Sequence, residues 1–192
     1  MPFKNYSFNN TKTNDMINKK INQFLFSMIV GITLAISAGC TTDNPPTAPT
    51  NKTGLTVSVV TSTTGGNYSP KHVVAIWVEN SAGTFVKTLT VYAEARKFDL
   101  TNWNGISGGN VTDATTGATQ SNFGTIYGSW NGTDSKGVAV PDGTYRLCME
   151  LTDKGSTGNF SYFTFTKGTV AESQTPSNVP SFSTITIKWV PL

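Results

Sequence analysis

Side chains able to do chemistry are scarce in this chain, and most of them are hydroxyls. The 192 residues include one His and two Cys, too few for a zinc site of the usual kind. The aspartates that fall in turns lie far apart and predict no paired-carboxylate hydrolase site; they are Asp99, Asp113, Asp134 and Asp142. The sequence contains neither a G-x-S-x-G motif nor a phosphate-binding glycine loop. One segment is rich in hydroxyl and small side chains: DATTGAT, from Asp113 to Thr119.

The N-terminal part of the chain predicts an export signal that ends at a cysteine. Lys19-Lys20 precedes an apolar run at 24–36, which as a helix would rise only about 20 Å and is too short to cross a bilayer core of about 30 Å. A basic start, a short apolar stretch and small residues before the cut are typical of a secretory signal. Ser37-Ala38-Gly39-Cys40 resembles the lipobox of bacterial lipoproteins, which implies a signal peptide at 1–39 and lipid on Cys40. A plain signal peptide cleaved nearby is the alternative.

Removal of the signal also removes the net positive charge. The full chain has a formal charge of +3, but the part from Cys40 onward contains ten basic and ten acidic residues. A neutral protein gives no support for nucleic-acid binding. Residues 40–53 contain three prolines and no apolar anchor, so they predict a flexible tether, and residues 54–192 predict one folded domain. If Cys40 carries lipid, Cys148 has no disulfide partner and is expected to be a small buried hydrophobe.

Alternating apolar residues and frequent turns predict an all-β fold. Residues 73–78 are apolar on both faces, which favours a central strand covered on both sides. The other expected strands are 55–59, 85–92, 125–130, 143–152, 160–166 and 182–190. Together they predict an immunoglobulin-like antiparallel β-sandwich. The stretch between Arg96 and Gly124 is expected to be one long functional loop, with Trp103 as its main apolar anchor.

Two stretches of the domain resemble known families. Residues 130–145, WNGTDSKGVAVPDGTY, resemble the W-[DN]-G-x-D-x-x-G-x-x-V-P-x-G-x-Y hairpin in the immunoglobulin-like domain of flagellar hook-capping proteins. That motif is structural, because a tight turn starts at Asp134 and the rings of Trp130 and Tyr145 clamp the two strands. Residues 65–89, taken with Trp103, the DATTGAT segment and the hairpin, resemble the DUF2271 family of periplasmic proteins. This resemblance covers most of the domain and by itself implies no activity.

The DATTGAT segment also resembles D-x-x-[ST]-G-A-[ST], the acceptor motif of periplasmic flavin transferases. Those enzymes move FMN from FAD onto the hydroxyl of the last Thr or Ser and form a phosphoester. By this resemblance Thr119 is the attachment residue, and the transferase reads Asp113, Thr116, Gly117 and Ala118. Gly117 and Ala118 would keep the approach open, and an anionic Asp113 could hold a metal or a backbone amide during transfer. The structural alternative is a Thr/Gly-rich surface loop with an Asp-initiated turn.

The roles of two further ring side chains stay open at this point. Trp103 lies ten residues before the motif and suits either core packing or stacking on an isoalloxazine ring. His72 is the one imidazole of the chain, and it suits either an ordinary residue at the start of a buried strand or a proton relay or haem ligand. Trp77 and Trp189 lie in expected strands and are predicted to be core residues.

Together with export, the acceptor motif predicts an extracytosolic electron-transfer flavoprotein that carries FMN covalently on Thr119. It would face the periplasm or the cell surface, anchored in a lipid membrane through Cys40, and relay electrons from a membrane reductase to an external acceptor. Its partners would be the flavin transferase and a membrane-bound redox protein. The chain would be a carrier and not an enzyme. The alternative is a surface immunoglobulin-like binding or assembly lipoprotein without a cofactor, which the same fold also suits.

Overall fold

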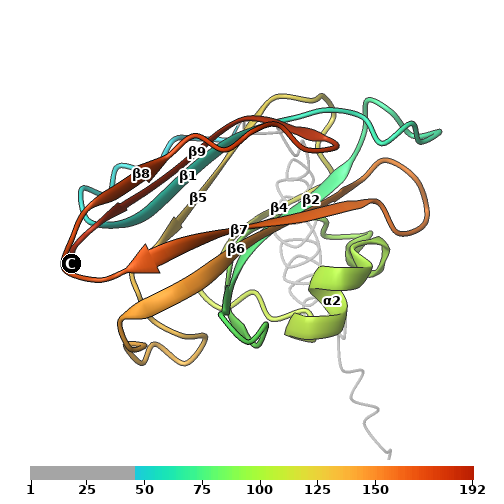
Figure 1. Cartoon of the computed structure of the whole chain (residues 1–192). Coiled ribbons are helices and arrows are strands. Elements are labelled where there is room, and N and C mark those ends of the chain that lie inside the picture. The colour runs from blue at the N-terminus through green and yellow to red at the C-terminus, as the bar shows by residue number, and fades with distance from the viewer. Residues whose placement is uncertain (1–45) are drawn as a thin grey trace, which may run out of the picture. The chain divides into compact units, whose positions relative to one another are not determined.

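The computed structural model describes residues 46–192, which form two β-sheets packed face to face (Figure 1). The predicted signal peptide at 1–39, Cys40 and the first residues of the predicted tether lie outside this range. One sheet has the strand order β5-β1-β9-β8, and the other has the order β4-β3-β2-β6-β7. The bounds are β1 Gly54–Thr61, β2 Val73–Asn80, β3 Phe85–Tyr92, β4 Thr115–Gly117, β5 Thr125–Trp130, β6 Gly143–Thr152, β7 Asn159–Lys167, β8 Glu172–Gln174 and β9 Phe182–Val190. The predicted all-β, immunoglobulin-like sandwich is therefore confirmed.

Strand β2 lies in the middle of the five-stranded sheet and is covered on both faces. Successive side chains of a strand point to opposite faces, so an apolar run fills two clusters at once. Val74, Ile76 and Val78 belong to the core between the sheets, whereas Val73, Ala75 and Trp77 belong to a second cluster on the outer face. The prediction of a central strand buried on both sides is confirmed, and the outer cluster requires an additional layer over this sheet.

The hairpin between β5 and β6 has the predicted turn and clamp. The Asp134 carboxylate accepts hydrogen bonds from the backbone N–H groups of Lys136, at 2.8 Å, and Val138, at 2.9 Å. These bonds close the turn and hold the pKa of Asp134 below its ordinary value. The rings of Trp130 and Tyr145 are buried, with centroids 5.2 Å apart. The hairpin is thus fixed to the core by its aromatic ends.

The stretch between Arg96 and Gly124 contains regular structure where the sequence predicted a loop. It contains the 3-10 helix η1 (Lys97–Asp99), the helix α2 (Thr101–Ser107) and strand β4. Figure 1 shows α2 against the face of the five-stranded sheet that points away from the other sheet, and Trp103 is buried there in the outer cluster. This helix supplies the additional layer over β2.

A buried carboxylate from β6 explains why α2 forms despite its unfavourable sequence. The residues TNWNGIS have weak helix propensity, and no side chain within the segment caps the first turn. Glu150, fully buried, accepts hydrogen bonds from the backbone N–H groups of Asn102, at 3.2 Å, and Trp103, at 2.9 Å. These are the N–H groups that the first turn of a helix leaves unpaired. The helix is therefore held by a tertiary contact, which local sequence patterns do not reveal.

Candidate functional site

The predicted acceptor segment includes the edge strand β4 of the five-stranded sheet. β4 pairs in parallel with β3, and the register places Val91 opposite Thr116 and Tyr92 opposite Gly117. No strand of residues 46–192 pairs with its other side, because β4 ends the sheet. Thr115 and Thr116 are exposed on this edge. The segment is thus presented at the surface on a strand that is anchored along one side only.

Gly117 lies against the ring of Tyr92, where a side chain has no room. A Cβ atom at this position would lie 2.8 Å from Tyr92 Cδ1 and 3.0 Å from Cε1. Tyr92 is itself packed in the core between the sheets. The carbonyl of Gly117 accepts hydrogen bonds from the N–H groups of Ala93, at 3.1 Å, and Glu94, at 3.3 Å. The close approach of β4 to β3 therefore requires a glycine at this position, whether or not another enzyme also recognises it.

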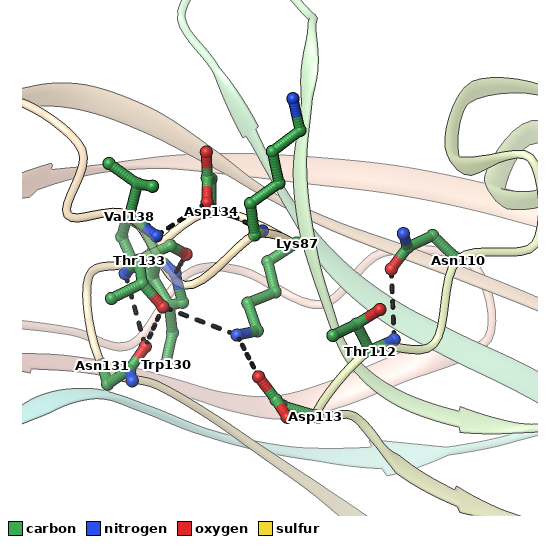
Figure 2. A network of polar contacts seen from close by, with 10 residues as sticks. Lys87, Asn110, Thr112, Asp113, Trp130, Asn131, Thr133, Asp134 and Val138 are labelled. Carbon is green, nitrogen blue, oxygen red and sulfur yellow. Dashed lines mark hydrogen bonds and ion pairs between the residues drawn. The ribbon is translucent and has the colours of Figure 1, made fainter.

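Asp113, the first residue of the segment, is paired with a buried lysine. Lys87 Nζ on β3 lies 3.1 Å from Asp113 Oδ2 and 3.5 Å from Thr133 Oγ1 in the hairpin, as Figure 2 shows. The lysine side chain is 7% exposed, whereas that of Asp113 is 71% exposed, so one carboxylate oxygen faces solvent-accessible space while the other neutralises Lys87. Asp113 has a positive φ of 55°, a conformation that Asp tolerates better than most residues. This carboxylate therefore fixes the start of the acceptor segment.

The residues just before Asp113 are tied to the same strand. Thr88 Oγ1 donates to the carbonyl of Asn110 at 2.6 Å. Figure 2 shows the Asn110 side chain, which accepts from the N–H of Thr112 at 3.1 Å. Trp103 Nε1 donates to the same Thr88 Oγ1 at 3.0 Å. A single threonine on β3 thereby joins α2 to the approach of the acceptor segment.

Thr119 lies between two anchored points of the backbone. On one side is Gly117, bonded to the end of β3, and on the other is Gln120, which exchanges two backbone hydrogen bonds with His72, at 3.0 and 2.9 Å. Ala118 and Thr119 are half-buried, and within the described range no hydrogen bond engages the Thr119 hydroxyl. The backbone thus holds Thr119 in place, and its hydroxyl has no hydrogen-bond partner in the part of the chain that the structure describes.

His72 anchors the far side of the segment and is buried. Its Nδ1 lies 3.1 Å from the carbonyl of Pro70, its ring stacks on Phe123 at 4.7 Å, and Nε2 has no hydrogen-bond partner among residues 46–192. Burial lowers the pKa of His72, and the bond to Pro70 and the charge of Asp153 offset that effect only in part. The residue is a neutral imidazole at the start of β2, which fits the structural interpretation.

A cleft of about 450 Å³ opens beside β4 on the outer face of the sheet. Its size lies within the range of small-molecule sites, and its lining combines an apolar base with a few polar groups. The apolar lining residues are Val91, Ala93, Trp103 and Val111, and the charged ones are Glu94 and Lys97. Gly109, together with Thr116 and Gly117 of the acceptor segment, completes the lining. Helix α2, through Trp103, and β4, through Thr116 and Gly117, thus both contribute to one cleft.

The structure brings together the residues of the acceptor segment and the cleft, and it adds residues that the sequence did not single out. Trp103 is fully buried in the outer cluster, which supports the core-packing alternative, and it is also one of the lining residues of the cleft. Lys87 was missed although it carried a signal, since a lysine interrupts an otherwise uncharged strand. Glu150 was also missed although it carried a signal, since it interrupts the apolar stretch from Leu147 to Leu151 in β6. Lys97 carried no signal, because nothing in its neighbourhood predicted a cleft.

Comparison with known proteins gives a family. No curated protein and no solved structure matches the chain. Within residues 46–192, no helix is long and apolar enough to cross a membrane, and no three His, Cys, Asp or Glu side chains gather as a metal-binding group. Residues 54–176 match the family described as "Predicted periplasmic protein (DUF2271)", from the first residue of β1 to just past β8. The chain therefore belongs to the DUF2271 family of predicted periplasmic proteins.

Proposed function

We propose that this protein is an extracytosolic electron-transfer flavoprotein that carries FMN as a phosphoester on Thr119. The observation that carries the proposal is the Asp113–Thr119 segment, which matches the flavin-transferase acceptor pattern and lies on an exposed sheet edge. Membership of a periplasmic family supports it, because such transferases act outside the cytosol. Bound FMN would supply one- or two-electron redox chemistry, and this chain would supply attachment, orientation and electrostatics.

The attachment step requires of this chain one accessible hydroxyl. The Thr119 oxygen would form a bond to the phosphorus on the riboflavin side of FAD, the pyrophosphate bond would break, AMP would leave, and the hydroxyl proton would pass to a base of the transferase. The free edge of β4 supports this step, since among residues 46–192 no strand pairs with that side and an approaching enzyme meets none of them there. The half-buried Thr119 then needs only a local opening of the two residues between its anchors.

The proposal also includes the attachment of the domain to a membrane. Cys40, after the predicted signal peptide, would carry lipid and hold the domain at a membrane surface. Anchoring there raises the effective concentration of the domain at a membrane-bound reductase, from which it would take electrons for an external acceptor.

The test is intact-protein mass spectrometry after incubation with a periplasmic flavin transferase and FAD. We expect a gain of one FMN minus water, about 438 Da. Thr119→Ala is expected to abolish the gain and Thr119→Ser to retain it. Thr115→Ala is the matched control, because Thr115 is exposed and lies in the same segment, four residues before Thr119. This variant is expected to be labelled. An unmodified wild-type protein, beside a known acceptor that is labelled in parallel, would contradict the proposal.

A second candidate function is a surface binding module without a cofactor. The observation that favours it lies at the opposite edge of the same sheet, where Phe160 and Tyr162 of β7 are 40% and 49% exposed. Exposed aromatic residues on an edge strand are typical of protein-binding surfaces. Absence of the mass gain would favour this candidate.

A further inference from the structure

We infer that the cleft between α2 and β4 receives the isoalloxazine ring of a flavin attached at Thr119. This inference rests on the proposed function and goes beyond it, since attachment alone would leave the ring in solvent. The cleft is the feature that makes a defined ring position possible. Its lining includes Trp103 and Val111, which are apolar, and Lys97 and Glu94, which are charged.

The size and chemistry of the cleft fit a flat aromatic ring with polar edges. A volume of about 450 Å³ accommodates a drug-sized ligand. The base consists of three side chains that are already buried: Val91 of β3, Ala93 just after β3, and Trp103 of α2. The base is therefore preformed and needs no further ordering of these side chains. The apolar surface that a ring would remove from water is mainly that of Val111, which lines the cleft and is 43% exposed.

The distance along the chain also fits. Thr116 and Gly117 line the cleft, and Thr119 follows Gly117 by two residues, about 7 Å in an extended backbone. A ribityl phosphate is a flexible chain of comparable length, so a ring attached at Thr119 can fold back along β4. The backbone anchors at Gly117 and Gln120 hold the attachment point at a fixed place relative to the cleft.

Two charged residues at the cleft suit the polar edge of a flavin. Glu94 and Lys97 are exposed and lie on the short connection from β3 to α2. The pyrimidine edge of the ring combines an N–H donor with carbonyl acceptors, and it gains negative charge on reduction. A cation at this edge stabilises the reduced form and a carboxylate opposes it, so the two residues set the reduction potential in opposite directions.

The experiment uses transferase-loaded protein and measures how accessible the flavin is to iodide by fluorescence quenching. We expect iodide to quench the attached flavin severalfold less than free FMN. Val111→Glu places a charge in the cleft at a valine that is 43% exposed and is expected to raise quenching toward the free value. Val170→Glu is the matched control, because this valine is 77% exposed and does not line the cleft.

A second arm tests the polar edge by anaerobic redox titration. Lys97→Gln is expected to lower the midpoint potential of the attached flavin, and Glu94→Gln to raise it. Quenching equal to that of free FMN in the wild type, or equal effects of the two Val→Glu variants, overturns the cleft assignment while the proposed attachment stands. Unchanged potentials in both charge variants overturn the ring orientation toward Lys97 and Glu94. No mass gain on loading overturns the attachment and the cleft assignment together.

Discussion

The ammonium group of Lys87 lies 3.1 Å from the Asp113 carboxylate, which makes the first residue of the acceptor segment the neutralising partner of a nearly buried cation. The same ammonium reaches Thr133 at 3.5 Å, so a single side chain of β3 joins the acceptor segment to the hairpin before β6 (Figure 2). Two stretches that look independent in the sequence are therefore coupled in the fold. Asp113 therefore has a structural role in this domain, in addition to any role in recognition by the flavin transferase.

This pair gives the first prediction. Asp113→Asn removes the charge opposite Lys87, and because the nearly buried ammonium then lacks a counter-charge the loss of stability is expected to be about 1–3 kcal/mol. The rate of labelling by the transferase is expected to fall clearly, because the start of the acceptor segment loses its ion pair with Lys87. Lys87→Met should slow labelling as well, and the double variant should be no slower than Asp113→Asn alone. Initial rates of the mass gain measure this, and wild-type labelling of Lys87→Met would contradict the anchoring role.

The second prediction separates two reasons for Gly117. Gly117→Ala places a methyl group against the buried ring of Tyr92, an overpacking that is expected to cost about 1–3 kcal/mol in urea unfolding. Tyr92→Leu makes room, so the double variant should regain part of that loss relative to Tyr92→Leu alone. If the transferase also reads the glycine, labelling stays low in the double variant. An unchanged unfolding midpoint in Gly117→Ala would show that β4 does not press on Tyr92.

The third prediction concerns the support of α2. Glu150→Ala leaves the N–H groups of Asn102 and Trp103 without their acceptor in a buried place, which is expected to cost at least about 1–3 kcal/mol. Glu150→Gln keeps the shape and one acceptor oxygen, so its loss should be smaller. Urea unfolding measures both, and hydrogen exchange should show that protection is lost first in α2. Equal stability of Glu150→Ala and the wild type would contradict the role of this carboxylate.

The sequence predicts the elements that local patterns specify, and it misses those that depend on contacts with distant residues. The strands were predictable because alternation and the doubly apolar run at 73–78 record which faces are buried. Helix α2 was not, since its stability comes from Glu150, nearly fifty residues away in the chain, and not from its own residues. Strand β4 was not predicted either, because its three residues are too few to show a periodic pattern. Its partner β3 is also distant in the sequence, with a helix between the two strands along the chain.

The same distinction applies to the candidate site. The acceptor segment was found because its residues are contiguous. The cleft was not, because its lining comes from β3, η1, α2 and β4 together. Trp103 shows the limit most clearly. The sequence left core packing and contact with a flavin as alternatives, and the fold makes this residue both a buried core residue and part of the lining.

The fourth prediction concerns membrane attachment. Cys40 follows a short apolar run and small residues, as in a lipoprotein signal. Cys40→Ala is therefore expected to move the protein from the detergent phase to the aqueous phase, or to leave it unprocessed. Cys148→Ala is the matched control, because Cys148 is buried in β6 and burial raises the pKa of its thiol, which leaves it unreactive. A Cys40→Ala protein that has lost its signal peptide and still enters the detergent phase would contradict the lipid anchor.

The last prediction is the pH dependence that the buried His72 imposes. Because burial lowers its pKa below the ordinary 6.5, the unfolded chain takes up a proton in a range where the folded domain does not. The free energy of unfolding should therefore stay constant above about pH 7 and fall as the pH drops below that ordinary value, by at most about 1.4 kcal/mol per pH unit.

Asp153 does not titrate in this pH range. Burial would raise the pKa of this carboxyl, but hydrogen bonds from Thr63, Thr64 and Gly66 outweigh that effect, so its own contribution is lost only in stronger acid, below its ordinary 3.8. His72→Asn keeps a donor for the Pro70 carbonyl and does not titrate, so its stability should change little between about pH 7 and pH 5. Urea unfolding of both proteins across this range measures the difference, and parallel curves would show that His72 is not the group responsible.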